Sequence, residues 1–224
     1  MLRVRIVFFD MDGVLVPIKS SWAYLHEYFG VAEEARRYLE AFERGEIDYV
    51  RWMELDTSLW VKARRGGCVH IRELLEVLGR VPVNPETQTV GRELHRRGVI
   101  VGIVSGGIDL LARRVASILG ADVWVANKLL FDKRGCLRPG GIPLVGVDKV
   151  GVVKRILGEY GIDPGEAMFV GDSRWDASVM RLVGYPVAYG DDCPLLDGIV
   201  KYRVRRLSEV VELVDRINNS GGVD

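Results

Sequence analysis

The hydrophobic pattern begins with a short continuous run and then changes its period. Residues 4–9 (VRIVFF) are mainly β-branched and aromatic, which is typical of a strand buried on both faces. From Ser21 to Leu78 the apolar residues recur instead at helical spacing. Glycines at 30, 45 and 66–67 divide this stretch, and the expected helices are residues 22–29, 32–42, 49–61 and 69–78.

Beyond Pro82 and Pro85, short apolar strands alternate with amphipathic helices. The expected helices are 86–97, 109–119, 147–160, 175–183 and 207–217, and the expected strands are 99–104, 122–126, 167–170, 186–189 and 199–203. This alternation predicts an α/β fold with a doubly wound, Rossmann-like parallel sheet. Residues 129–145, rich in Gly and Pro, are expected to hold a hairpin, and the tail 218–224 to fray. The predicted organisation is a core domain, residues 1–16 and 83–224, with a helical cap domain, residues 17–82, inserted after the first strand.

Composition narrows the class of partner. The chain has 31 Lys and Arg against 31 Asp and Glu, so no basic field points to nucleic acid or to a membrane surface. No apolar run approaches the length of a membrane span or a signal peptide. The cysteines Cys68, Cys136 and Cys193 are widely spaced, and we interpret them as reduced thiols of a cytoplasmic protein. The expected partner is therefore a small molecule, and the sequence sets no oligomeric state.

Acidic and small residues follow three of the expected strands. Asp10 and Asp12 come after the first strand, Ser105 and Gly106 after the second core strand, and a further acidic segment, GDSRWD, after residues 167–170. Ligands of open α/β sheets bind outside the carboxyl ends of the strands, so these segments are expected to meet. Taken singly, each motif could be only a turn or a helix cap. Taken together they indicate an active site, because packing has no use for so many neighbouring carboxylates.

These segments also carry a family resemblance. DMDGVL at 10–15, VSGG at 104–107, a lysine within GVDKVGVVK and GDSRWD at 171–176 together resemble the haloacid dehalogenase superfamily of phosphohydrolases, in its phosphoserine-phosphatase-like branch. The resemblance implies that Asp10 is the nucleophile that forms an aspartyl-phosphate, and that Asp12 is the general acid and then base. It also implies that Ser105 and Lys149 hold the phosphoryl oxygens, with the amide of Gly106 beside them. Lys154 is the alternative lysine in that segment.

The same resemblance implies Mg²⁺ as the cofactor. The expected ligands are Asp10, Asp172 and the carbonyl of Asp12, and Asp176 is expected to orient metal-bound waters or Lys149. The three histidines, His26, His70 and His95, are interpreted as surface or packing residues.

Two positions that bind the substrate in phosphoserine phosphatases have the opposite charge here. Lys19 stands where that family has an acidic residue for the serine amine, and Asp56 stands where it has an arginine for the carboxylate. Trp175 replaces an asparagine before the last aspartate. Lys19 suits a leaving group with its own anion, whereas Asp56 could accept an ammonium if the substrate bound end for end. Trp22, Trp52 and Trp60 could be a pocket wall or the packing of the cap.

The predicted function is Mg²⁺-dependent hydrolysis of a small phosphorylated metabolite, with phosphoserine itself in question. Two alternatives stay open at this point. One is a phosphotransferase or mutase that uses the same pair of aspartates, and the other is a non-catalytic regulatory domain that kept the fold.

Overall fold

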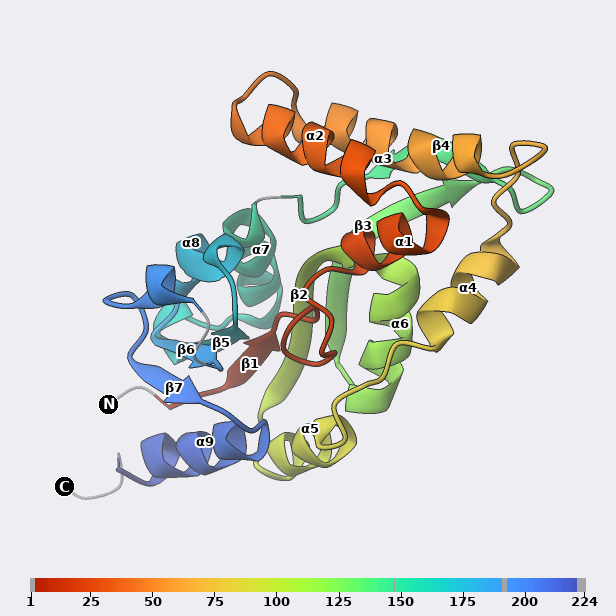
Figure 1. Ribbon diagram of the computed structural model, residues 1–224. Helices are drawn as coiled ribbons and strands as arrows, with labels where there is room; N and C mark the ends of the chain where they lie inside the picture. The colour runs from red at the N-terminus through yellow and green to blue at the C-terminus, as the bar shows by residue number, and fades with distance from the viewer. Residues whose placement is uncertain (1–2, 147, 191–192, 221–224) are drawn as a thin grey trace.

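The computed structural model describes residues 3–146, 148–190 and 193–220, and within these residues a seven-stranded sheet forms the centre (Figure 1). The strand order is β4-β3-β2-β1-β5-β6-β7, and all neighbouring strands are parallel except β3 and β4. The bounds are β1 Ile6–Phe9, β2 Ile100–Ile108, β3 Val123–Phe131, β4 Leu137–Ile142, β5 Ala167–Gly171, β6 Tyr185–Tyr189 and β7 Tyr202–Val204. The doubly wound α/β prediction is confirmed.

Successive side chains of β1 point to opposite faces of the sheet, and all of them are buried. Helices therefore cover both faces. Val7 and Phe9 pack with apolar residues of α4, α5, α6 and α9, whereas Ile6 and Phe8 pack with those of α7 and α8. The helix bounds are α1 Ser21–Phe29, α2 Ala32–Glu43, α3 Tyr49–Ala63, α4 Ile71–Gly79, α5 Thr87–Arg96, α6 Asp109–Leu119, α7 Lys149–Tyr160, α8 Ala177–Met180 and α9 Ser208–Ser220.

Helices α1, α2 and α3 lie over the carboxyl ends of the central strands (Figure 1). Helix α3 packs along β4, where Gly140 N donates to Thr57 Oγ1 at 2.7 Å, so the hairpin of the core supports the inserted helices. Helix α4 instead packs beside α6, whose Arg114 donates to the carbonyl of Val81 at 2.7 Å. The boundary of a cap domain at residues 17–82 stays a prediction.

Several elements differ from the predicted ones, among them strand β3, which continues to Phe131, five residues beyond its expected end. Strand β2 continues through Ser105 to Ile108 with a shift of register after Val104, so Gly106 and Gly107 lie in an irregular strand end instead of at a helix start. The expected helix 175–183 is reduced to a 3₁₀ turn, Arg174–Asp176, and the short α8, and Ser173 and Asp176 form a capping box at the start of this turn. Helix α9 remains regular to Ser220, and the rest of the tail predicted to fray, like Val147, lies outside the described residues.

The prediction of three reduced cysteines is wrong. Cys68 and Cys136 form a disulfide with their Cα atoms 5.1 Å apart, and Cys193 is free. A bridge between His70 and Cys136 pairs the segment before α4 with the turn of the β3–β4 hairpin and so brings the two sulfurs together. A separation of 68 residues left no local signal of this pairing. The cytoplasmic prediction therefore loses the support of free thiols. Within the described part of the chain, no helix has the length and apolarity to span a bilayer.

Candidate active site

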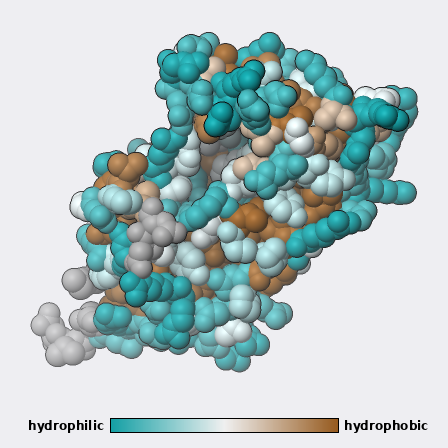
Figure 2. Space-filling view, in the orientation of Figure 1, coloured by the Kyte–Doolittle hydropathy of each residue, from teal (hydrophilic) through white to brown (hydrophobic). Residues whose placement is uncertain are grey.

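The carboxyl ends of β1, β2 and β5 open into a cleft of about 460 Å³ beneath the inserted helices. Figure 2 shows the surface hollowed below α2. Residues from both layers line the cleft: Asp10, Asp12, Lys19, Ser20, Trp22, Tyr49, Trp52, Ser105, Gly106, Gly107, Gly146, Lys149, Asp172, Ser173, Arg174, Trp175, Cys193 and Leu195. The expected meeting of the strand ends is thus present in the structure.

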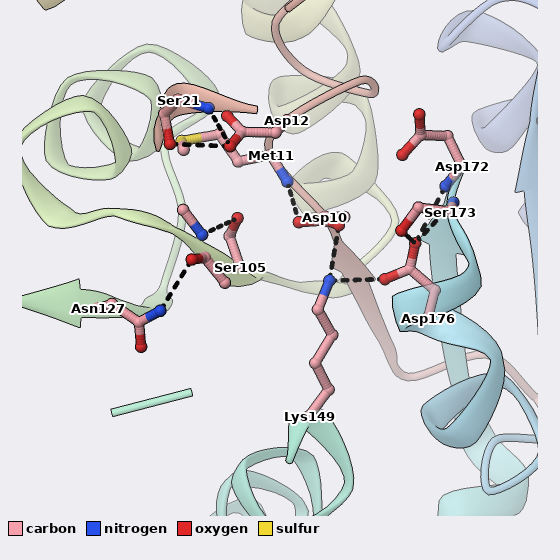
Figure 3. Close-up of polar contacts among 12 residues, drawn as sticks. Asp10, Met11, Asp12, Ser21, Ser105, Asn127, Lys149, Asp172, Ser173 and Asp176 are labelled. Atoms are coloured by element: carbon pink, nitrogen blue, oxygen red, sulfur yellow. Dashed lines mark hydrogen bonds and ion pairs between the residues drawn. The ribbon is translucent and has the colours of Figure 1, made fainter. Parts of the chain in front are cut away.

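Lys149 is the centre of the charged network (Figure 3). Its ammonium, on the first turn of α7, lies 2.6 Å from Asp10 Oδ2 and 2.6 Å from Asp176 Oδ1. All three side chains are buried, whereas the alternative Lys154 is exposed. The structure therefore places Lys149, and not Lys154, at the strand ends.

Asp176 holds the loop after β5 as well as Lys149. Its Oδ2 accepts hydrogen bonds from the backbone amides of Asp172 and Ser173, at 3.1 and 3.0 Å, and from Ser173 Oγ at 3.1 Å (Figure 3). Both carboxylate oxygens of Asp176 are thus already engaged by donors of the protein. That Asp176 orients metal-bound waters or Lys149 stays a prediction.

Gly13 explains how the loops after β1 and β5 approach so closely. Its φ is +79°, and a Cβ on Gly13 would lie 2.1 Å from Asp172 Oδ2. Only glycine gives both the left-handed conformation and the space. The turn after β1 therefore leaves room for the Asp172 carboxylate.

Asp12 points to a different neighbour from Asp10. Its Oδ2 accepts from the Ser21 amide at 2.7 Å and from Ser21 Oγ at 2.8 Å, at the start of α1. Its Oδ1 is buried and has no hydrogen-bond partner among residues 3–146, 148–190 and 193–220, although Asp12 lines the cleft. Asp12 thus has one oxygen fixed by the protein and one that a reacting group can engage.

Asn127, which the sequence analysis missed, organises the β2 side of the cleft. Its Nδ2 donates to the Gly106 carbonyl at 2.8 Å, and its Oδ1 accepts from the amides of Val145 and Gly146. Ser105 Oγ accepts from the Gly107 amide at 3.1 Å (Figure 3). The sequence does carry a signal for Asn127, because it comes directly after the expected strand 122–126. The predicted site residues follow three other strands.

Burial shifts the acid–base properties of the site. Desolvation raises the pKa of Asp10 to about 7, against the attraction of Lys149, and raises the pKa of Asp12 to about 6, against the hydrogen bonds from Ser21. Burial alone would lower the pKa of Lys149, but the charges of Asp10 and Asp176 outweigh it and raise that pKa. The pKa of Asp172 is also raised, first by desolvation. Such carboxyls in one cleft are typical of acid–base catalysis or of a cation site.

The cap-side residues are divided between two cavities. Lys19 lines the cleft, and its Nζ lies 3.2 Å from Asp172 Oδ2. Asp56 does not reach the cleft; it is buried behind Trp22 and Trp52, beside a small second cavity, and contacts His26. Trp22, Trp52 and Trp175 line the cleft, whereas Trp60 is fully buried. His26 is buried against the Trp60 ring, so this histidine has the packing role expected of it.

The acidic residues also fit a hard divalent cation. One carboxylate oxygen from each of Asp10, Asp172 and Asp176 lies within 4.8 Å of the others, and every donor is oxygen, as Mg²⁺ prefers. Among the described residues, the Asp176 carboxylate accepts four hydrogen bonds, whereas the Asp10 carboxylate accepts two and the Asp172 carboxylate one. Asp10 and Asp172 are therefore the carboxylates with more capacity to ligate. This arrangement is compatible with the predicted metal ligands.

Comparison with known proteins agrees with the fold and with the family resemblance. The family profile of haloacid dehalogenase-like hydrolases matches residues 4–184, and the chain belongs to this family. Phosphoserine phosphatase of Methanocaldococcus jannaschii is 25% identical over 84% of this chain and 86% of its own length. Phosphoserine phosphatase of Archaeoglobus fulgidus is 27% identical over 83% of this chain, and this chain spans 52% of that protein.

A solved phosphoserine phosphatase that holds an analogue of the phospho-aspartyl intermediate has the same fold. It superposes with a TM-score of 0.75 at 24% identity and covers 94% of this chain and 99% of its own. The family match and the phosphoserine phosphatases among the relatives confirm the resemblance to the phosphoserine-phosphatase-like branch.

Proposed function

We propose that the protein is a Mg²⁺-dependent phosphatase that hydrolyses a small phosphomonoester through an aspartyl-phosphate on Asp10. The observation that carries this proposal is the contact of Asp10 with Lys149 at the floor of a cleft whose walls come from three strand ends and the inserted helices. Membership of the hydrolase family and the phosphoserine phosphatases among its relatives support the reaction class.

Asp10 is suited to nucleophilic attack. Its Oδ1 accepts from the Met11 amide at 2.7 Å, which fixes the carboxylate, while Lys149 contacts Oδ2. Covalent catalysis of this kind splits one difficult hydrolysis into two easier steps. Lys149, Ser105 and the Gly106 amide are proposed to hold the phosphoryl oxygens, and the Lys149 ammonium would offset their charge.

Asp12 is proposed to transfer the protons. With a pKa of about 6, Asp12 can be protonated and donate a proton to the leaving alcohol. Once ionised, it can activate the water that hydrolyses the aspartyl-phosphate. The hydrogen bonds from Ser21 to Oδ2 leave Oδ1 for this exchange. This division between fixed and free oxygens suits a residue that acts twice in one cycle.

The proposed metal ligands are Asp10, Asp172 and the Asp12 carbonyl. When bound there, Mg²⁺ would neutralise charge on the transferring phosphoryl group. The protein residues would fix the ligand geometry, with Asp176 holding the Asp172 loop.

The proposed substrate is a small phosphorylated metabolite whose leaving group contacts α1 and α3. The cleft has the size of sites for small ligands, and Trp22, Tyr49 and Trp52 form its cap-side wall. Lys19 at the rim disfavours phosphoserine bound with its ammonium toward residue 19, because like charges in a closing pocket repel.

A phosphate-release assay on a panel of phosphomonoesters, phosphoserine included, tests the proposal. We expect turnover with Mg²⁺, loss of turnover in excess chelator and recovery when Mg²⁺ is restored. Lys154→Ala serves as the control for Lys149→Ala, because Lys154 is exposed on the same helix. Full activity in chelator would refute the metal assignment, and absence of turnover on every ester would refute the phosphatase.

A further inference from the structure

Asp56 is a buried carboxylate directly behind the aromatic wall of the cleft. It lies on α3, and its side chain is only 3% exposed. It lines a small cavity of about 10 Å³ together with Trp22, Tyr49, Trp52 and Met53. The first three of these residues also line the main cleft, so the small cavity adjoins the cleft at these rings.

The hydrogen bonds around His26 determine the charge beside Asp56. Trp60 Nε1 lies 2.9 Å from His26 Nδ1, and an indole nitrogen can only donate. His26 Nδ1 is therefore the acceptor, and the proton of the neutral imidazole is on Nε2. That nitrogen lies 3.3 Å from Asp56 Oδ2. His26 thus offers Asp56 a neutral N–H, and not a compensating positive charge.

The other oxygen of Asp56 has no hydrogen-bond partner within the part of the chain that the structure describes. Oδ1 is buried and accepts no hydrogen bond, and among the described residues no lysine or arginine forms an ion pair with this carboxylate. A buried carboxylate without a cation is unfavourable, and an unpaired buried oxygen adds to that penalty. Desolvation accordingly raises the pKa of Asp56. The arrangement is complementary to an incoming cation.

The residues that line the cavity and its volume indicate which kind of cation it can hold. The faces of tryptophan and tyrosine rings attract positive charge, and a carboxylate supplies the directional acceptor. The cavity has room for about one water-sized group. A primary ammonium has that size, whereas a trimethylammonium is much larger.

We propose that Asp56 and the rings of Trp22, Tyr49 and Trp52 form a subsite for a primary ammonium group on the leaving alcohol of the substrate. This inference rests on the proposed phosphatase activity and names its substrate class: phosphomonoesters of amino alcohols. The ammonium donates to Asp56 Oδ1 while the phosphoryl group lies at Asp10. Lys19 lines the cleft but not the small cavity, so this orientation keeps the ammonium away from its like charge.

A water molecule is the alternative occupant. Trp52 Nε1 is also buried without an acceptor, and one water could accept from it and donate to Asp56 Oδ1. In that case Asp56 would fill a structural role and substrates with and without an ammonium would react alike. The two occupants therefore predict different selectivity.

The test compares ω-aminoalkyl phosphates of increasing chain length with alkyl phosphates in which a methyl group replaces the ammonium. The kcat/KM of the parent protein is expected to favour the amine by about 10- to 100-fold at the chain length that reaches Asp56, the range for a hydrogen bond to a charged group. The trimethylammonium analogue of that length should lose this advantage. A ratio near one at every length would overturn the subsite and leave the phosphatase intact. Absence of hydrolysis in both series, with turnover of other esters in the panel, would overturn the subsite alone, whereas absence of hydrolysis of every ester would overturn the proposed function and the subsite with it.

Asp56→Asn removes the charge at nearly constant shape and keeps an oxygen for His26. We expect it to lower the amine-to-alkyl ratio about tenfold or more. Glu54→Gln is the matched control, because Glu54 lies on the same helix, half-exposed and paired with Arg51, and should leave the ratio unchanged. A parent-like ratio in Asp56→Asn would refute the role of Asp56. If that variant does not fold, the parent ratio and the trimethylammonium analogue decide the question.

Discussion

At the scale of single residues, the pair Asp10 and Asp12 shows how one short segment places two carboxylates in different surroundings. In a regular strand, residues two apart share one face of the sheet. Here β1 ends at Phe9 and the chain turns at Gly13, so Asp10 contacts Lys149 while Asp12 contacts Ser21. The two carboxyls therefore have different neighbours, which is what a nucleophile and a proton donor require.

Replacing Asp12 by asparagine is expected to reduce kcat by about 10²- to 10⁴-fold, the usual contribution of general acid–base catalysis. The asparagine oxygen can still accept from Ser21, so the thermal unfolding midpoint should change little. Steady-state kinetics on the best ester provide the measurement. An Asp12→Asn variant with the parent kcat would remove Asp12 from the proton-transfer role.

The raised pKa of Asp10 links metal binding to pH. At a pKa of about 7 the carboxyl is partly protonated at neutral pH, and a cation binds only the ionised form. The apparent Mg²⁺ affinity should therefore rise as the pH increases through about 7, with release of up to about one proton. Calorimetric titrations in buffers of different ionisation enthalpy measure that release. Asp10→Asn, which lacks the titrating carboxyl, is the control. Equal Mg²⁺ affinity of the parent protein on both sides of pH 7 would contradict the assignment of Asp10 as a metal ligand.

At the scale of elements, periodicity predicted the order of strands and helices but not the irregular ends that build the site. The run at residues 4–9 and the alternation after Pro85 reflect local burial, which a sequence pattern records directly. The register shift after Val104 and the capped loop at Asp176 depend on contacts between distant segments. The contact between α3 and the β3–β4 hairpin, where Gly140 donates to Thr57, also joins segments far apart in the sequence. Strand ends were therefore predictable as the location of the site, whereas Asn127 and Ser21 were not recognised as parts of it.

Gly13→Ala tests the close approach of two loops. The substitution is strained at a φ of +79°, which costs about 1–2 kcal/mol, and its Cβ would displace the Asp172 carboxylate. We expect lower stability together with weaker Mg²⁺ binding and loss of turnover. Gly30→Ala is the control, because Gly30 has a φ of +69° but no atom within 4 Å of the added Cβ. It should lose stability alone; the same activity loss in both variants would refute the steric argument.

The disulfide between Cys68 and Cys136 ties the segment before α4 to the β3–β4 hairpin. Closing a loop of 68 residues in the unfolded chain should stabilise the protein by about 2–4 kcal/mol. Cys68→Ser is therefore expected to lower the free energy of unfolding in denaturant by that amount, and Cys193→Ser to change it little. Three titratable thiols in the unfolded, unreduced protein would show instead that the bond does not form.

At the scale of the whole molecule, the inserted helices complete a cleft that the sheet alone would leave open. Trp22 Nε1 donates to the Gly106 carbonyl at 3.0 Å, and the Tyr49 hydroxyl accepts from Asn127 at 2.8 Å. Arg174, in the loop after β5, pairs with Glu43 at the end of α2. These contacts hold an aromatic wall on the cleft that Asp10 lines, so the proposed chemistry and the proposed selectivity come from different layers.

The most direct test of the central claim is to identify the phosphorylated residue. Asp12→Asn protein is mixed with Mg²⁺ and the best ester, quenched in acid and digested for peptide mass analysis. The expected result is a hydroxylamine-sensitive phosphoryl group on the peptide that contains Asp10, absent from Asp10→Asn protein. Two results would contradict the proposed mechanism. One is turnover by the parent with no acyl-phosphate in Asp12→Asn protein, and the other is a phosphoryl group on a residue other than Asp10.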